Sequence, residues 1–124
     1  MTKKIMNVDD SVSMRQIVSS TLQSAGYETV SAVDGEDALG KLATTAVDLI
    51  ITDLNMPRLD GIGLIKRLRA STTHKFVPVL ILTTVSEEKM KQEGRAAGAT
   101  GWVVKPFRPE QLLATVRKVL GPDA

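Results

Sequence analysis

The chain has 124 residues, a formal net charge of +2 at pH 7 and no cysteine. This length suits a single domain, and we expect residues 1–124 to share one hydrophobic core. Without cysteine the chain has no disulfides and no thiolate metal ligands. Its dispersed positive charge and its single Trp and single Tyr argue against a nucleic-acid-binding surface.

The sequence also predicts no association with a membrane. It has no apolar stretch that approaches the roughly 20 residues needed to span a bilayer. Residues 1–4 lead directly into Ile5 and a polar segment at 7–10, which is unlike the apolar core of a signal peptide. We therefore expect a cytoplasmic protein.

The first part of the chain predicts two strands, each followed by a helix. Residues 4–8 form a short apolar run, and apolar residues then recur at helical spacing from Ser13 until Gly26, where a helix would stop. Residues 27–32 predict the second strand. An Asp-Gly turn at 34–35 precedes the second helix.

A more continuous apolar run, residues 47–52, predicts a central strand that is buried on both faces. Asp53 follows directly at its carboxyl end. Pro57 and an Asp-Gly pair at 60–61 then close the loop before a third helix. Because open parallel sheets bind ligands outside the carboxyl ends of their strands, Asp53 is the first candidate site residue.

The second half predicts two more pairs of strand and helix. Residues 77–82 form a fourth buried strand, and Ser86 is the expected N-cap of a helix with two glutamates in its first turn. That helix is thinly apolar and contains Gly94, so we expect it to be the least firmly packed. Residues 101–104 predict the fifth strand, and the last helix begins at Pro109.

Five strands that alternate with five helices predict a parallel sheet covered on both faces. In such a sheet the residues that follow each strand converge on one rim. The polar residues expected at this rim are Asp9, Asp10, Asp53, Thr83, Thr84 and Lys105. The second strand, which ends at Ala32, is expected to contribute nothing comparable.

Three carboxylates at one rim repel each other, which raises a pKa unless a cation joins them. Mg²⁺ suits such a site because it accepts carboxylates and a backbone carbonyl and usually binds beside phosphate. These residues favour phosphoryl transfer with Asp53 as the nucleophile. The metal and Lys105 would offset the charge of the phosphoryl group, and the Thr83 hydroxyl could hydrogen-bond one of its oxygens.

Four segments carry a family resemblance: VDDS at 8–11, DLNMPRLDG at 53–61, ILTT at 81–84 and GATGWVVKPF at 98–107. Together they resemble the receiver domain of two-component response regulators, and most closely the single-domain chemotaxis regulators of the CheY type. The resemblance implies a flavodoxin-like three-layer sandwich, whose five-stranded parallel sheet has the order 2-1-3-4-5.

The resemblance also implies roles for individual residues. Asp53 would be the phosphoacceptor. The implied Mg²⁺ ligands are Asp9, Asp10, Asp53 and the backbone carbonyl of Asn55. The implied phosphoryl-binding and switch residues are Thr83, Thr84, Lys105 and Trp102, and the Lys105–Pro106 bond would be cis.

In this family the strand-four hydroxyl moves toward the phosphoryl group, and an aromatic residue on strand five turns inward. Trp102 departs from the usual Tyr or Phe, and its bulk argues against a full rotation. Val85 stands where some chemotaxis members carry an acid that affects loss of the phosphoryl group, so the sequence does not predict the phosphoryl lifetime. Asn7, a polar residue inside the first strand, has no role that the sequence suggests.

The resemblance implies protein partners. They are a sensor histidine kinase of the CheA type as phosphodonor, a target such as the flagellar motor switch, and a phosphatase. We expect a monomer that acts in chemotaxis and whose target binds a face including Lys91, Trp102 and Lys105. We expect no enzymatic activity beyond self-catalysed phosphoryl transfer and slow autodephosphorylation.

Two other functions were weighed against this one. A Mg²⁺-dependent phosphohydrolase of the haloacid dehalogenase type would place an acid two residues after the nucleophile, where this chain has Asn55. A flavodoxin-like binding module would need a Gly-rich phosphate loop after the first strand, where Asp9 and Asp10 would repel phosphate. Some residues also have plain alternatives: one of these acids as a helix cap, Lys105 as a solvated lysine and Trp102 as a packing residue.

Overall fold

Five parallel strands form the middle layer of the computed structural model, which describes residues 2–121. The strands are β1 (Lys4–Val8), β2 (Glu28–Ala32), β3 (Leu49–Thr52), β4 (Val79–Thr83) and β5 (Gly101–Val104). The helices are α1 (Val12–Ser24), α2 (Gly35–Leu42), α3 (Gly61–Ala70), α4 (Glu88–Ala97) and α5 (Pro109–Leu120). The strand order β2-β1-β3-β4-β5 confirms the predicted fold class.

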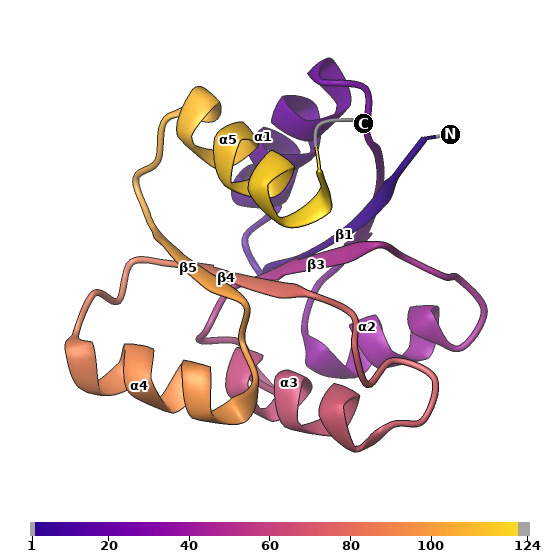
Figure 1. The fold of residues 1–124 in the computed structure, drawn as a ribbon, viewed down its shortest axis with the longest axis vertical. Helices are drawn as coiled ribbons and strands as arrows, with labels where there is room; N and C mark the ends of the chain where they lie inside the picture. The colour runs from indigo at the N-terminus through magenta and orange to yellow at the C-terminus, as the bar shows by residue number, and fades with distance from the viewer. Residues whose placement is uncertain (1, 122–124) are drawn as a thin grey trace.

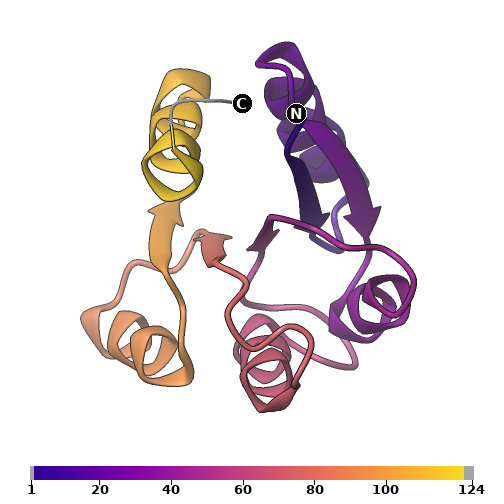
Figure 2. The ribbon, with the colours of Figure 1, turned by 45° about the vertical axis from the view of Figure 1, so that its right-hand side comes forward.

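The helices cover the sheet on two sides. α1 and α5 pack on one face, and α2, α3 and α4 pack on the other, as Figure 1 and the turned view in Figure 2 show. β3 is buried along its whole length, and its side chains alternate between the two cores. Leu49 and Ile51 pack with the α1 and α5 side, whereas Ile50 packs with the α2 and α3 side.

The register of the strands determines which residues meet at the carboxyl rim. Val8 pairs with Thr52, so Asp53 follows β3 at the level where Asp9 follows β1, and the Asp53 N–H donates to the Val8 carbonyl at 2.9 Å. The Lys105 N–H likewise donates to the carbonyl of the last β4 residue at 2.8 Å. Ladder hydrogen bonds therefore place the rim residues side by side.

Three predicted strands begin one or two residues later in the structure. β2 begins at Glu28 rather than at Tyr27, β3 at Leu49 rather than at Val47, and β4 at Val79, directly after Pro78, rather than at Val77. Pro78 has no N–H to give to the ladder, but its carbonyl accepts a hydrogen bond from the Ile50 N–H at 3.0 Å. No helix within residues 2–121 is long and apolar enough to cross a membrane.

The predicted start of α4 is wrong. α4 begins at Glu88, and its N-cap is Glu87, whose side chain makes no capping hydrogen bond, rather than Ser86. Just before Ser86, the backbone of Val85 makes two hydrogen bonds: its N–H donates to a side chain of β4, and its carbonyl accepts from a side chain of β5. These contacts keep the chain extended past the residue that local composition marks as a cap.

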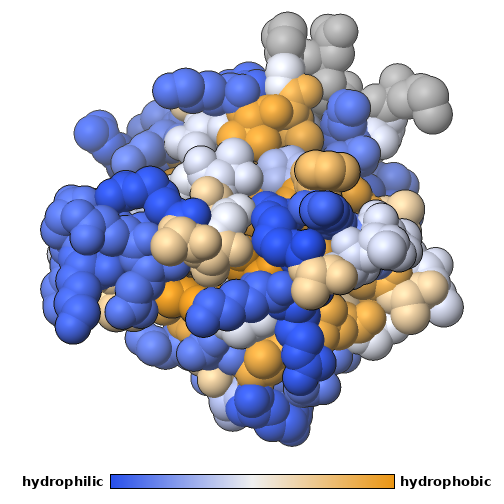
Figure 3. All heavy atoms as spheres, turned by 60° about the horizontal axis from the view of Figure 1, so that its bottom comes forward, coloured by the Kyte–Doolittle hydropathy of each residue, from blue (hydrophilic) through white to orange (hydrophobic). Residues whose placement is uncertain are grey.

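α4 is thinly packed, as predicted. Among its residues only Gly94 is fully buried. Figure 3 looks toward the side of α2, α3 and α4 and shows a mostly hydrophilic surface with smaller hydrophobic areas between. α4 is therefore attached mainly through a few contacts with its neighbours rather than through a wide apolar face.

Candidate functional site

Three carboxylates meet at the carboxyl rim of the sheet. Oxygen atoms of Asp9, Asp10 and Asp53 all lie within 4.8 Å of one another. Asp9 is buried, Asp53 is half-buried and Asp10 is exposed, so the cluster opens to solvent on one side. A hard divalent cation prefers oxygen ligands in such an arrangement.

Neither acid after β1 serves as the cap of α1. Ser11 is the N-cap, and its hydroxyl accepts a hydrogen bond from the Met14 N–H at 3.2 Å. Asp9 Oδ1 accepts from the Ser11 N–H at 2.9 Å, which fixes the turn that leads into the helix. The capping alternative is therefore wrong, and the Asp10 side chain remains available at the rim.

Lys105 places a cation among these acids. Its Nζ atom lies 2.9 Å from Asp9 Oδ2 and 3.5 Å from Asp53 Oδ2. The Lys105 side chain is only 11% exposed, which contradicts the alternative of a solvated lysine. The ammonium group offsets the mutual repulsion of the carboxylates, and the bond that follows it, to Pro106, is cis as predicted.

Asp53 is held by both of its carboxylate oxygens. Oδ1 accepts a hydrogen bond from the Leu54 N–H at 2.7 Å, and Oδ2 faces Lys105. A carboxylate held in this way presents a defined oxygen to an incoming group. Asn55, two residues further on, is exposed on the same loop, and the role implied for its carbonyl stays a prediction.

Thr83 is buried at the end of β4 and is linked to Trp102 through the backbone of one residue, Val85. The Thr83 hydroxyl accepts a hydrogen bond from the Val85 N–H at 3.4 Å. The Val85 carbonyl in turn accepts one from the Trp102 indole Nε1–H at 2.9 Å. Thr84 is exposed, and its predicted phosphoryl contact stays a prediction.

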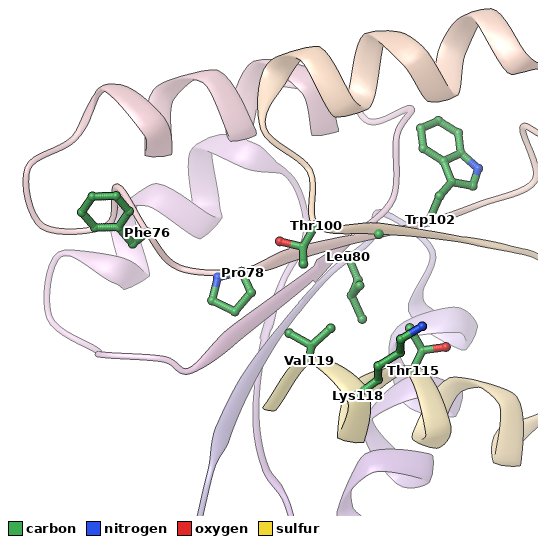
Figure 4. Close-up of a pocket in the computed structure, with 9 residues that line it drawn as sticks. Phe76, Pro78, Leu80, Thr100, Trp102, Thr115, Lys118 and Val119 are labelled. Atoms are coloured by element: carbon green, nitrogen blue, oxygen red, sulfur yellow. The ribbon is translucent and has the colours of Figure 1, made fainter. Parts of the chain in front are cut away.

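Trp102 lies on the α4 side of the sheet. In Figure 4 its indole points away from Leu80 and Val119, which face each other on the α5 side. A Cβ atom at Gly94 would lie 2.9 Å from Trp102 Cζ3, so the ring rests directly against the α4 backbone. The absence of a side chain at position 94 makes room for this bulky aromatic.

Asn7, which the sequence left without a role, has a structural one. It is buried in β1, and its Nδ2 atom donates to the Arg15 carbonyl at 3.0 Å and to the Ser19 hydroxyl at 3.4 Å. These bonds tie β1 to α1. The Arg15 guanidinium also donates to the Asp9 carbonyl at 2.7 Å, so the same helix steadies the backbone of the first acid.

The second strand contributes no residue to the acidic cluster, but a buried acid follows it. Asp34, two residues after β2, is fully buried and pairs with the Arg58 guanidinium from the β3–α3 loop. In the sequence, the Asp-Gly pair at 34–35 predicts only a turn. Sequence alone could not indicate the partner, because Arg58 comes from another loop.

Two of the surface grooves lie at opposite ends of β5. One, of 300 Å³, borders the rim and is lined by Met14, Ile17, Pro106, Phe107 and Pro109. The other, of 720 Å³, lies between α5 and the amino ends of β4 and β5, where Figure 4 shows Phe76, Thr115 and Lys118 around it. None of the residues that line this second groove belongs to the acidic cluster.

The fold and the site together define a doubly wound α/β protein with a cluster of three carboxylates at its carboxyl rim that could bind a divalent cation. The family model of the response regulator receiver domain matches residues 5–117. The chain therefore belongs to the response regulator receiver domain family of two-component systems.

Chemotaxis proteins are among the similar structures and sequences. The structure of CheY4 of Vibrio cholerae is 51% identical and superposes with a TM-score of 0.93, covering 97% of this chain and 100% of that chain. Chemotaxis protein CheY1 of Helicobacter pylori strain J99 is 38% identical over 122 residues, which are 97% of this chain and 98% of that protein.

Longer regulators are also similar. The probable transcriptional regulator ycf27 of Porphyridium aerugineum is 39% identical over 118 residues, which are 95% of this chain but only 48% of that protein. The chain thus spans about half the length of this relative. Receiver domains take phosphate from histidine kinases, bind Mg²⁺ at an acidic pocket and act as signalling switches rather than as classical enzymes. The family assignment gives no support to the phosphohydrolase alternative.

Proposed function

We propose that Asp53 accepts a phosphoryl group from the phosphohistidine of a partner kinase. The observation that supports this most strongly is Lys105, whose ammonium lies within 3.5 Å of both Asp9 and Asp53 in a largely buried position. An Asp53 oxygen forms the new O–P bond while the N–P bond to the histidine ring breaks, and the released ring nitrogen takes up a proton. Lys105 offsets the charge on the transferred group.

The acidic cluster fits the magnesium that receiver domains use. Its three carboxylates supply hard oxygen ligands, and the exposure of Asp10 leaves room for the waters that Mg²⁺ retains. We propose Asp9, Asp10, Asp53 and the Asn55 carbonyl as the ligands. When bound, the ion supplies positive charge next to the phosphoryl oxygens.

We propose that the Thr83 hydroxyl holds a phosphoryl oxygen. Its hydroxyl accepts from the Val85 N–H, which leaves its own O–H available to donate. Once the hydroxyl turns toward the phosphoryl group, the Val85 N–H loses its acceptor. The backbone of Val85, whose carbonyl binds Trp102, is then free to move, so the change at Asp53 reaches the face formed by α4, β5 and α5.

This face, which includes Lys91, Trp102 and Lys105, is the proposed target-binding surface. Phosphorylation shifts an existing equilibrium toward the binding form, by no more than the difference in interaction that the phosphoryl group makes in the two forms. Nuclear magnetic resonance spectra recorded with and without beryllofluoride, a phosphoryl mimic, test this. We expect shifts at Trp102 and along α4, and shifts confined to the surroundings of Asp53 would contradict the switch.

The phosphoacceptor itself is tested by intact mass after incubation with Mg²⁺ and a small phosphodonor. We expect one labile phosphoryl group on the wild-type protein and none on Asp53→Asn. Asp48→Asn is a matched control, because Asp48 is an exposed acid just before the same strand. Equal labelling of Asp53→Asn and the wild type would refute the assignment.

The apolar groove beside the rim is the proposed docking surface for the kinase. Ile17 of α1 is 51% exposed there, and the groove also includes Pro106 and Phe107, which directly follow Lys105. We expect Ile17→Glu to slow transfer from a CheA-type kinase but not labelling by a small phosphodonor. Phe76→Glu alters an even more exposed apolar residue in the distant groove and should change neither reaction.

The similarity to CheY4 and CheY1 supports a chemotaxis role, with a target such as the flagellar motor switch and with a phosphatase that ends the signal. A cytoplasmic location, a monomeric state and a single-domain organisation of residues 1–124 remain predictions. Phosphotransfer from a purified CheA-type kinase, compared with kinases of other pathways, tests the chemotaxis assignment. Preferential transfer from the CheA type is the expected result.

A further inference from the structure

The loop between β3 and α3 carries two of the proposed magnesium ligands, Asp53 and Asn55, and it is anchored to the turn between β2 and α2. The Leu59 carbonyl accepts a hydrogen bond from the Gly35 N–H at 3.0 Å. The contact leaves no room for a side chain at position 35, because a Cβ there would lie 2.7 Å from the same carbonyl. The two loops are thus packed backbone against backbone.

A buried carboxylate reinforces this anchor. Asp34 is fully buried, and its Oδ1 atom caps α2 by accepting a hydrogen bond from the Asp37 N–H at 2.9 Å. Among the described residues its Oδ2 atom has no hydrogen-bond partner of standard geometry, and it is paired with the Arg58 guanidinium. A buried carboxylate without a cation is strongly destabilising, so the pairing ties Arg58 to the β2–α2 turn.

Arg58 occupies a backbone conformation that favours glycine. Its φ of 66° lies in the left-handed region, and it is the only non-glycine residue with positive φ among residues 2–121. This conformation is less favourable for a residue with a side chain than for glycine. The Arg58 side chain offers what glycine would lack, namely a guanidinium that reaches Asp34.

We propose that the Asp34–Arg58 ion pair positions the β3–α3 loop for magnesium. The pair lies three residues beyond Asn55 in the same loop and holds that loop against a part of the fold that does not belong to the acidic cluster. Asp34 and Arg58 are then positioning residues that act through the loop and do not touch the ion. This inference rests on the proposed magnesium site.

The test is a magnesium titration of the full chain by calorimetry, with urea unfolding of the same samples. Arg58→Gly keeps the left-handed backbone accessible and removes only the side chain, and Asp34→Asn keeps a residue that can cap α2. We expect each to weaken magnesium binding by about 10-fold, the low end for partners of metal ligands. Arg58→Lys, which retains the cation, should restore most of the affinity.

The sign of the change separates positioning from simple electrostatics. Removing a cation near a magnesium site should tighten binding if charge alone mattered. Arg67→Gly is the matched control for the lost charge, because Arg67 pairs at 3.8 Å with Glu36 of α2 from an exposed position on α3. We expect its magnesium affinity to stay within about 2-fold of the wild type, as for a surface pair.

Each outcome has one meaning. Weakened binding in Arg58→Gly and Asp34→Asn, with no further loss in the double variant, supports the proposal. If Arg58→Gly binds magnesium as tightly as the wild type or more tightly, and only its unfolding free energy is lowered, the proposal is overturned. The ion pair would then only stabilise the fold. If Asp34→Asn does not fold, the variants of the exposed residue Arg58 still test the proposal. A wild-type protein that binds no magnesium would instead refute the proposed metal site.

Discussion

The contact between Gly94 and Trp102 can be tested by one added methyl group. Gly94→Ala would place a Cβ 2.9 Å from Trp102 Cζ3 and 3.1 Å from Ile81 Cδ1. The indole cannot retreat freely, because its Nε1–H is bonded to the Val85 carbonyl at 2.9 Å. The substitution should therefore displace the ring and weaken that hydrogen bond.

The size of the effect follows from two opposing terms. Replacing a helical glycine with alanine stabilises a helix by about 1 kcal/mol. Overfilling a packed site costs about 1–3 kcal/mol. We therefore expect Gly94→Ala to lower the free energy of unfolding by about 1 kcal/mol, the difference between a mid-range cost and the helical gain.

Gly40→Ala is the matched control. Gly40 is in α2, and a Cβ at that position meets no atom within 4 Å, so only the helical gain of about 1 kcal/mol remains. Urea unfolding followed by circular dichroism compares the two variants. Trp102 is the only tryptophan, so its emission reports directly on the ring, and we expect a red shift in Gly94→Ala alone. Equal stabilisation by both substitutions would refute the packing argument.

Three further variants test separate contacts. Asp37 has a lowered pKa, mainly because its carboxylate accepts a hydrogen bond from the Val33 N–H. The Asp37 carboxylate therefore stabilises the fold above the unfolded pKa of about 3.9, and this stabilisation is lost as the pH falls through the lower folded pKa. Asp37→Asn should be less stable by about 1 kcal/mol at pH 7, and unfolding curves should converge with the wild type in acid; a constant gap would contradict this. Lys105→Met should destabilise the magnesium-free protein by about 3 kcal/mol, because Asp9 loses its buried partner. Urea unfolding should show that magnesium recovers part of this loss. Equal losses with and without the ion would count against the ion pair. Thr83→Ala should still accept the phosphoryl group but lose the change in tryptophan fluorescence that we expect beryllofluoride to produce in the wild type, and a full wild-type response would exclude the Val85 link.

Much of the rim could be predicted from the sequence because each of its parts is local. A buried apolar run that ends in an acid indicates both a strand and the position of Asp53 at its carboxyl end. Parallel topology then brings the ends of β1, β3, β4 and β5 together without any knowledge of side-chain contacts. The cluster of Asp9, Asp10, Asp53 and Lys105 follows from this geometry.

The contacts that escaped prediction join different elements of the fold. The burial of Asp34 depends on Arg58 from another loop, and a turn pattern carries no trace of that partner. Ser86 has the composition of a cap, yet the Trp102 indole holds the preceding residue and delays α4. Gly94 was interpreted as a weak point of the helix, whereas it makes room for the Trp102 ring.

The central claim is that Asp53 is the residue that becomes phosphorylated. Borohydride reduction of the phosphorylated protein converts an aspartyl phosphate into homoserine and so marks the modified position permanently. After digestion and peptide sequencing by mass spectrometry, we expect homoserine at position 53 only, and none when magnesium is removed by a chelator. Homoserine at Asp10 or another acid, or full labelling without magnesium, would contradict the account.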